Sequence, residues 1–206
     1  MADIMRLLID WTNTPIGELA IITDQDGNLR AVDWTDHDES MRRLLRLHYG
    51  AGGFVLDPAR DPGGMTQAID SYFAGRLTAI DGLRVETAGT AFQRAVWRAL
   101  REIPCGTTIS YAALAQRIDR PAAVRAVGLA NGANPVGIVV PCHRVVGSDG
   151  AMTGYGGGIE RKRWLLAHER AAHPPCASAD TSTDAGPVAG RHGRGAGPSD
   201  PPEVGR

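Results

Sequence analysis

The large apolar residues of this 206-residue chain stop at Leu166, because no Leu, Ile, Met, Phe, Trp or Tyr follows it. Residues 171–206 are mostly Pro, Gly, Ala, Ser and Asp with scattered charges. Such a segment buries too little apolar surface to offset the entropy of ordering it. We therefore predict a disordered tail over 171–206, in which Cys176 and His173 have no function. The folded part is confined to residues 1–170, enough for one large domain or two small ones.

The composition excludes several classes of protein. Hydrophobic residues make up 43% of the chain and charged residues 22%, as in globular proteins. No apolar run approaches the roughly 18 residues that a membrane-spanning helix needs. The N-terminus also lacks the basic flank and apolar centre of a secretion signal. We expect a cytoplasmic protein that does not contact a membrane.

Three cysteines, Cys105, Cys142 and Cys176, occur without a paired CxxC spacing. Their odd number and wide separation predict neither a disulfide framework nor a zinc site. Each thiol therefore needs its own explanation, and we expect no bound metal.

The net charge of -1 conceals a division along the chain. Residues 1–91 carry 8 Lys or Arg and 14 Asp or Glu, whereas residues 92–170 carry 11 and 5. A basic block of this kind suits a phosphate-backbone partner. RNA, a nucleotide or a merely solvated face would fit it as well.

The first segment reads as a small sheet. Apolar-rich runs at 16–23 and 29–34 flank Asp26-Gly27, a pair that suits a tight turn with positive φ, so we predict a hairpin. Residues 7–11 can add a third strand.

Two helices are predicted to follow. The spacing of Asp36 and Glu39 suits a capping box for a helix that ends before Gly50. After Pro62, apolar residues recur at helical spacing until Gly75. We expect the aromatic residues of this second helix to belong to the core.

The basic block reads as three helices. Thr90 can cap a helix that ends before Pro104, and Ser110 can cap the next one, 111–118. Pro121 suits the first turn of a third helix over 121–131. The short break between the last two is typical of a helix-turn-helix, although an ordinary helical hairpin fits equally well.

The chemistry is concentrated after this block. The β-branched run 136–140 is predicted to form a buried strand that ends at Cys142 and His143, before a glycine-rich loop (147–158) and a helix (159–170). A reactive thiol needs a base or a positive field nearby. Neighbouring residues on a strand point to opposite faces, so direct contact of this pair would need a turn or an intervening water. On the residues alone, a buried structural cysteine beside a hydrogen-bonded histidine remains an alternative.

The run Pro141-Cys142-His143-Arg144-Val145 resembles the methyl-acceptor signature of the methylated-DNA–protein-cysteine methyltransferases, or O6-alkylguanine-DNA alkyltransferases. The resemblance extends from Thr14-Pro15-Ile16-Gly17 to Leu165-Leu166-Ala167-His168-Glu169. Other stretches match in order between them: Tyr72-Phe73-Ala74-Gly75, Phe92-Gln93-Arg94-x-x-Trp97, Ser110-Tyr111-x-x-Leu114-Ala115, Arg125-Ala126-Val127-Gly128, Asn134-Pro135 and Gly154-Tyr155-x-Gly157-Gly158. The chain is most similar to bacterial members that consist of the transferase alone.

The resemblance implies an α/β protein of two domains. Residues 1–88 would form a small ribonuclease H-like domain, an antiparallel sheet with helices. Residues 89–170 would form a mostly helical, winged-helix-like domain with a helix-turn-helix. The family inserts the second helix of that motif into the minor groove of double-stranded DNA, with little sequence preference. We expect a monomer that needs no cofactor.

The resemblance also implies the reaction. Cys142 would take the alkyl group from O6-methylguanine, or from O4-methylthymine, and keep it as a thioether, so that each molecule acts once. Glu169 would orient His143, which would reach the thiol through a water. Asn134 would tie the second helix of the motif to the active-site strand.

Further residues match positions that handle DNA. The target base must leave the stack to reach a thiol. Arg125 would fill the vacated space, Tyr111 would press on the phosphate of the lesion, and Arg120 and Ser148 would also contact DNA. The pocket for the extruded base would be lined by Val145, Tyr155 and Gly156.

Two alternatives belong to other functional classes. The first is a non-catalytic binder of alkylated DNA, although such relatives usually carry tryptophan where Cys142 stands. The second is a hydrolase that uses a Cys-His pair, such as a cysteine peptidase. Loss of one thiol per equivalent of substrate, rather than turnover, would separate the transferase from both.

Overall fold

A computed structural model describes residues 4–50 and 53–172. The tail predicted over 171–206 therefore lies outside the described residues, except for the last two residues of the final helix. None of the helices in the described ranges has the length and apolar character that crossing a bilayer requires.

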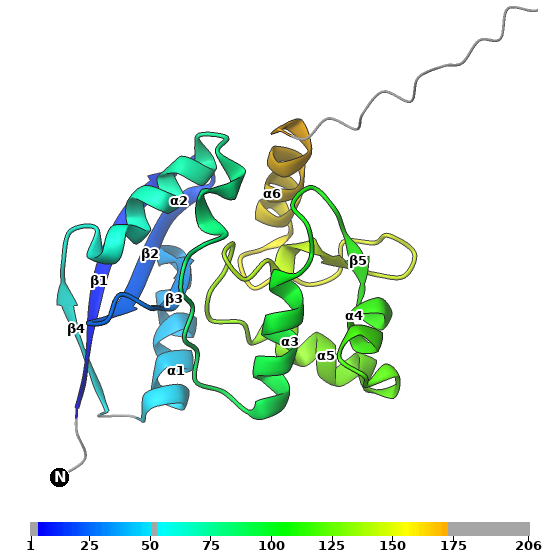
Figure 1. The fold of residues 1–206 in the computed structure, drawn as a ribbon, viewed down its shortest axis with the longest axis horizontal. Helices are drawn as coiled ribbons and strands as arrows, with labels where there is room; N and C mark the ends of the chain where they lie inside the picture. The colour runs from blue at the N-terminus through cyan, green and yellow to red at the C-terminus, as the bar shows by residue number, and fades with distance from the viewer. Residues whose placement is uncertain (1–3, 51–52, 173–206) are drawn as a thin grey trace, which may run out of the picture. The chain divides into compact units, whose positions relative to one another are not determined.

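The N-terminal half is built on a four-stranded sheet (Figure 1). Its strands are β1 (Met5–Thr14), β2 (Gly17–Asp24), β3 (Leu29–Trp34) and β4 (Phe54–Pro58), in the spatial order β3-β2-β1-β4. The predicted hairpin is confirmed, and Gly27 adopts the positive φ that its turn requires. The sheet is not wholly antiparallel, because β4 joins β1 in parallel. This strand was missed, since it is short, ends in Pro58 and has no fully buried residue.

Helices cover both faces of this sheet. Side chains of α1 (Asp38–Tyr49) are buried with Leu7 and Ile22 on one face, and those of α2 (Met65–Phe73) pack with Leu19 and Ile21 on the other. The predicted span of α2 is confirmed. The predicted capping box of α1 is wrong, because Asp36 lies in a preceding 3-10 turn and its carboxylate pairs with a distant arginine instead.

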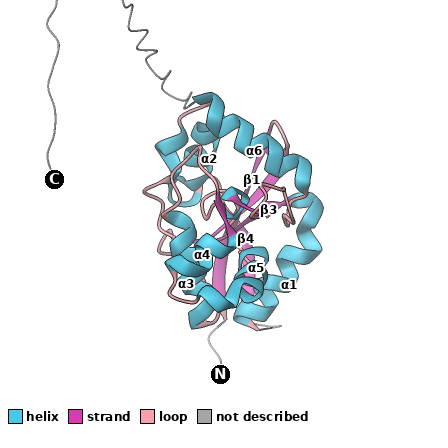
Figure 2. Cartoon of the chain, turned by 90° about the vertical axis from the view of Figure 1, so that its right-hand side faces the viewer, coloured by secondary structure: helices cyan, strands magenta, loops and turns pink. Residues whose placement is uncertain are grey.

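The C-terminal half is mostly helical, as Figure 2 shows. Its helices are α3 (Ala91–Arg101), α4 (Tyr111–Arg117), α5 (Val124–Gly132) and α6 (Ile159–Ala172). Thr90 and Gln93 form a reciprocal capping box on α3, and the Ser110 hydroxyl accepts from the backbone N–H of Ala113 to begin α4. These caps confirm the predicted helix starts. The short strands β5 (Ile109–Ser110) and β6 (Val145–Val146) pair in parallel.

The strand predicted over 136–140 is absent from the described structure. Val136 makes one isolated bridge with Val32, and residues 137–140 form turns. The Asn134 side-chain amide donates to the carbonyls of Val136 and Val140, at 3.3 and 2.8 Å, and so replaces a partner strand. Cys142 therefore begins a 3-10 turn (Cys142–Arg144) rather than ending a strand.

The two halves share one apolar core. Val32 and Trp34 of β3 are buried in the same cluster as Val96, Leu100 and Val136 of the C-terminal half. Val32 also exchanges backbone hydrogen bonds of 2.9 Å with the carbonyl of Pro135 and the N–H of Gly137. The end of β3 is thereby held beside the segment that leads to Cys142.

Candidate active site

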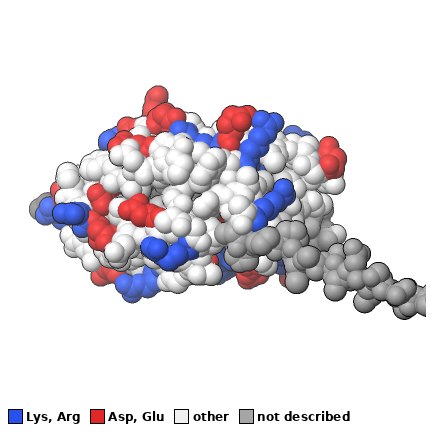
Figure 3. Space-filling model, turned by 90° about the horizontal axis from the view of Figure 1, so that it is seen from above, with Lys and Arg blue, Asp and Glu red and all other residues white. Residues whose placement is uncertain are grey.

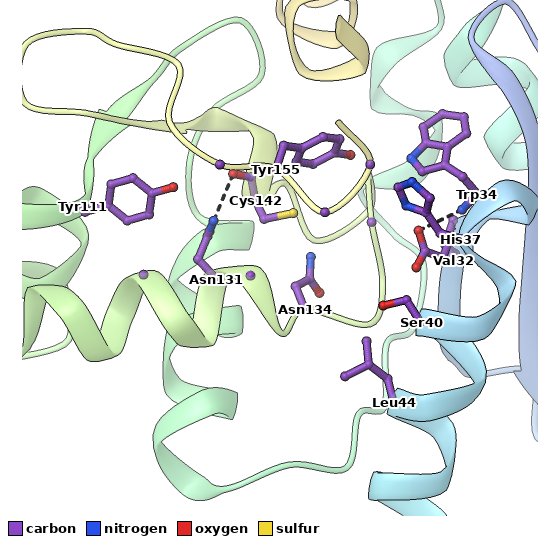
Figure 4. A pocket seen from close by; sticks show the side chains of 17 residues that line it. Val32, Trp34, His37, Ser40, Leu44, Tyr111, Asn131, Asn134, Cys142 and Tyr155 are labelled. Atoms are coloured by element: carbon purple, nitrogen blue, oxygen red, sulfur yellow. Dashed lines mark hydrogen bonds between the residues drawn. The ribbon is translucent and has the colours of Figure 1, made fainter. Parts of the chain in front are cut away.

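A cavity of about 250 Å³ lies beside Cys142 and is lined by residues of both halves. Figure 4 shows the Cys142 thiol between Asn134 and Tyr155, with Tyr111 on one side and Trp34, His37 and Ser40 on the other. Cys142 is 7% exposed. Within the described ranges, no three His, Cys, Asp or Glu side chains are placed to hold a metal ion.

The Cys142 backbone is fixed on both sides of the thiol. Its N–H donates to the carbonyl of Val140 at 2.8 Å, and its carbonyl accepts from Nδ2 of Asn131 at 3.5 Å. Burial raises the pKa of the Cys142 thiol, whereas hydrogen bonding by Asn134 and the charge of Lys162 act in the opposite direction. Nδ2 of Asn134 donates to the same Val140 carbonyl at 2.8 Å.

His143 and Glu169 form a fully buried pair, with 2.9 Å between Nε2 and Oε1. Burial lowers the pKa of His143, so its neutral form is favoured. Because Nε2 faces a carboxylate, it carries the proton, and Nδ1 is left as an acceptor. Nδ1 has no hydrogen-bond partner among the described residues.

Glu169 is the centre of a buried hydrogen-bond network. Besides His143, its carboxylate accepts from Nε of Arg144 at 2.9 Å, from the hydroxyl of Tyr72 at 2.9 Å and from the backbone N–H of Gly106 at 3.2 Å. Burial favours the neutral carboxyl, but the hydrogen bonds from His143 and Arg144 outweigh it and hold the pKa of Glu169 well below its usual range. Tyr72 is a core residue, as predicted, but its hydroxyl also belongs to this network.

Lys162 is a residue of the site that the sequence did not reveal. It is completely buried, and Nζ donates to the carbonyl of Val145 at 2.6 Å and to that of Thr153 at 3.0 Å. Its charge lowers the pKa of the Cys142 thiol. In the sequence it stands between Arg161 and Arg163, where a charged run suggests a solvated helix face, and nothing local shows its burial.

The glycine-rich loop is held against the N-terminal half by Arg161. This side chain lies 4.4 Å over the Trp34 ring and donates to both carboxylate oxygens of Asp36, at 3.0 and 2.8 Å. It also donates to the carbonyl of Gly157 at 3.2 Å. A Cβ on Gly157 would approach Nε1 of Trp34 to 2.4 Å, so this position has no room for a side chain.

The other predicted site residues lie in three kinds of environment. Tyr111, Tyr155 and Gly156 line the cavity with Cys142. Val145 is completely buried and is not among the lining residues. The residues predicted to contact DNA outside the pocket are all exposed: Arg120 before α5, Arg125 on α5 and Ser148 in the glycine-rich loop.

The face over α2 and α6 carries charges of both signs. On the part of this face visible in Figure 3, basic and acidic side chains are interspersed. The DNA-binding prediction rests on two exposed arginines, Arg125 of α5 and Arg120 in the segment before it.

Each half of the chain matches a known protein domain. Residues 7–87 match the ribonuclease-like domain of 6-O-methylguanine DNA methyltransferase, and residues 91–171 match its DNA binding domain. A methylated-DNA–protein-cysteine methyltransferase of Shigella flexneri is 52% identical over 165 residues, which cover 80% of this chain and 96% of that protein.

Solved structures agree with this match. The O6-methylguanine methyltransferase of Mycobacterium tuberculosis superimposes with a TM-score of 0.67 at 38% identity, covering 82% of this chain and 96% of that one. A structure of the M. tuberculosis protein in complex with DNA gives the same TM-score and identity, with coverage of 81% and 94%. The resemblance carried by the sequence motifs is thus confirmed, and the chain belongs to the 6-O-methylguanine DNA methyltransferase family.

Proposed function

We propose that this protein repairs alkylated DNA by moving the alkyl group from O6 of guanine to Sγ of its own Cys142. The observation that carries the proposal is a buried thiol at a cavity, next in sequence to a histidine that pairs with a buried carboxylate. Membership of the methyltransferase family supports it. The protein is then a methylated-DNA–protein-cysteine methyltransferase, and the expected substrates are O6-alkylguanine and O4-alkylthymine.

The buried pair accounts for removal of the thiol proton. Glu169 fixes the Nε2–H tautomer of His143, so Nδ1 accepts the proton of Cys142 through one water. The nearby charge of Lys162 favours the thiolate that results. Because the proton passes through a water, the side chains of Cys142 and His143 need not touch. The two residues can therefore cooperate although they are neighbours in the chain.

The transfer step is a displacement at the alkyl carbon. The thiolate forms a bond from sulfur to carbon while the bond from carbon to O6 breaks, and that electron pair stays on the base. The guanine anion then takes up the proton that left the thiol. The product on the protein is a thioether, which ordinary reductants do not reverse, so one molecule is consumed for each lesion.

DNA handling is assigned to α4 and α5. A base within a duplex must rotate out of the stack, which costs a few kcal/mol. Tyr111 lies at the cavity and would press on the phosphate of the lesion, while exposed Arg125 would fill the vacated space. Arg120 and Ser148 would bind the backbone. Entry of α5 into the minor groove suits damage recognition with little sequence preference.

The pocket and the domain division complete the proposal. Tyr155 and Gly156 would contact the extruded base, with Val145 behind them. Two domains, 1–88 and 89–170, agree with the limits of the two family matches. A monomer suffices, because one chain supplies every assigned residue. A thiol nucleophile suits the reducing cytoplasm.

Mass spectrometry after incubation with duplex DNA that contains one O6-methylguanine tests the function. A single methyl on the peptide that bears Cys142, with guanine restored in the DNA, is the expected result. Unmodified protein that still holds the lesion would indicate a non-catalytic binder. Several products for each protein molecule would indicate a hydrolase.

A further inference from the structure

The N-terminal half forms one end of the active-site cavity. Tyr111, which begins α4, lies on one side of the Cys142 thiol, and Trp34, His37 and Ser40 lie on the other (Figure 4). In the proposed reaction, a base that enters past Tyr111 would present O6 to sulfur. The part of an alkyl group beyond its first carbon then has room toward the N-terminal half, and the side chains there can select among alkyl groups.

Asp33 gives this end of the cavity its charge. Of the 17 described residues that line the cavity, Asp33 is the only Asp or Glu, and none is Lys or Arg. Its Oδ1 accepts from the backbone N–H of Trp34 at 2.8 Å. No other hydrogen bond from a described residue reaches the carboxylate.

Arg161, whose charge lowers the pKa of this carboxyl, forms its own hydrogen bonds with other groups. Arg161 forms two hydrogen bonds to Asp36, donates to the carbonyl of Ile16 at 2.9 Å and stacks on Trp34. Its attraction only partly offsets the desolvation of Asp33, and burial raises the pKa of that carboxyl. The charge of Asp33 also raises the pKa of the Cys142 thiol, as expected for two groups on one cavity.

We propose that Asp33 makes the N-terminal end of the cavity a charge-selective subsite, which admits neutral alkyl groups and disfavours those that end in a carboxylate. The inference rests on the proposed alkyl transfer to Cys142. Two carboxylates brought into one partly closed cavity repel each other with little screening by solvent. A neutral group of similar size meets no such penalty, and a hydroxyl can donate to the carboxylate of Asp33.

The experiment compares two lesions within each protein. Duplexes carry O6-carboxymethylguanine or O6-(2-hydroxyethyl)guanine, and single-turnover uptake by the Cys142 peptide is followed by mass spectrometry at pH 8, where histidines are ordinarily neutral. We expect the ratio of carboxymethyl to hydroxyethyl transfer to rise about tenfold in both Asp33→Asn and Asp33→Ser, a change of ~1.4 kcal/mol in relative activation free energy. The ratio, unlike a rate, is insensitive to a general loss of activity.

Two controls complete the design. Asp33→Glu keeps the charge and should keep the low ratio. Asp57→Asn removes an exposed carboxylate of the same half, which pairs with Arg6, and should leave the ratio unchanged. An unaltered ratio in both neutral variants, with uptake from O6-methylguanine intact, overturns the subsite. Failure of the wild-type protein to take up methyl would instead overturn the proposed function.

Discussion

Nε2 of His143 lies 2.9 Å from Oε1 of Glu169, and neither side chain is exposed to solvent. The same carboxylate holds Arg144, which follows His143, and the hydroxyl of Tyr72 on α2 in the N-terminal half. The orientation of the His143 ring thus depends on a network that joins both halves of the protein. Disturbing this network should affect stability and reactivity together.

Replacement of Glu169 by Gln should therefore cause a large loss of both folding stability and methyl uptake. Arg144 would keep a buried charge without its carboxylate, and breaking a buried pair in this way costs about 3–5 kcal/mol. An amide also cannot bind His143 and Arg144 as strongly as a carboxylate does. Urea unfolding should show the lost stability, and single-turnover methyl uptake should show a lower rate in the protein that remains folded.

Tyr72→Phe is the matched control for that change. It removes one neutral donor to Glu169 and leaves the ion pair, so the loss should be about 1 kcal/mol, with slow but measurable methyl uptake. Glu169→Gln with wild-type stability and rate would contradict the network as described.

Much of the fold can be predicted because its signals are local. Thr90 and Ser110 begin their helices with side-chain hydrogen bonds to residues three positions later, and such spacing is visible in a sequence. The strand predicted over 136–140 is wrong because the structure of this segment depends on a tertiary contact rather than on a local signal. Its β-branched residues have strand propensity, but its carbonyls are bound by the Asn134 side chain, a tertiary arrangement that propensity does not show.

Some residues of the candidate site could likewise be identified from the sequence, and others could not. Cys142, His143 and Glu169 could be named because their motif resembles a known family, and the structure places the last two in contact. Lys162 and Asp33 could not be named. Lys162 is buried where its charge acts on the thiol, and Asp33 lines the cavity, so the importance of both depends on segments far apart in the chain being brought together.

Cys142→Ser should abolish transfer and keep DNA affinity. A hydroxyl is a far weaker nucleophile than a thiolate, while exposed Arg125 of α5 and Arg120 before it are untouched. Binding of duplex with one O6-methylguanine, measured by fluorescence anisotropy, should match wild type, and mass spectrometry should find no methyl on the protein. An active serine variant would mean that another residue is the acceptor.

Lys162→Met should move the pH dependence of methyl uptake. The charge of Lys162 lowers the pKa of the Cys142 thiol, so its removal raises that pKa and moves the rate profile to higher pH. Because the thiol is mostly protonated at pH 7, raising its pKa lowers the thiolate fraction at that pH, and with it the rate of methyl uptake. Lys162→Arg keeps the charge and should keep the position of the profile even if packing slows the reaction. Equal pH–rate profiles for Lys162→Met and the wild-type protein would show that Lys162 does not stabilise the thiolate.

Acidification should destabilise the protein in two stages. Burial depresses the pKa of His143 below its ordinary 6.5, so the unfolded chain binds its proton first and stability falls as the pH drops through that value. Glu169 has a depressed pKa too, and its contribution is lost below about pH 4.5, its ordinary value. Melting temperatures measured from pH 8 to pH 3 should fall below about pH 6.5 and fall further below about pH 4.5, and a flat profile between pH 7 and 5 would show that His143 is not held neutral.

Arg125→Ala should separate extrusion of the base from the chemistry. Arg125 is exposed on α5 and has no part in thiol activation, so free O6-methylguanine base should react at the wild-type rate. Repair in duplex DNA should slow about tenfold or more, since the vacated space is no longer filled, which corresponds to ~1.4 kcal/mol or more. Arg42→Ala, which removes an exposed arginine of α1 that pairs with Asp38, should change neither rate. Equal slowing of both substrates in Arg125→Ala would place this side chain in the chemical step instead.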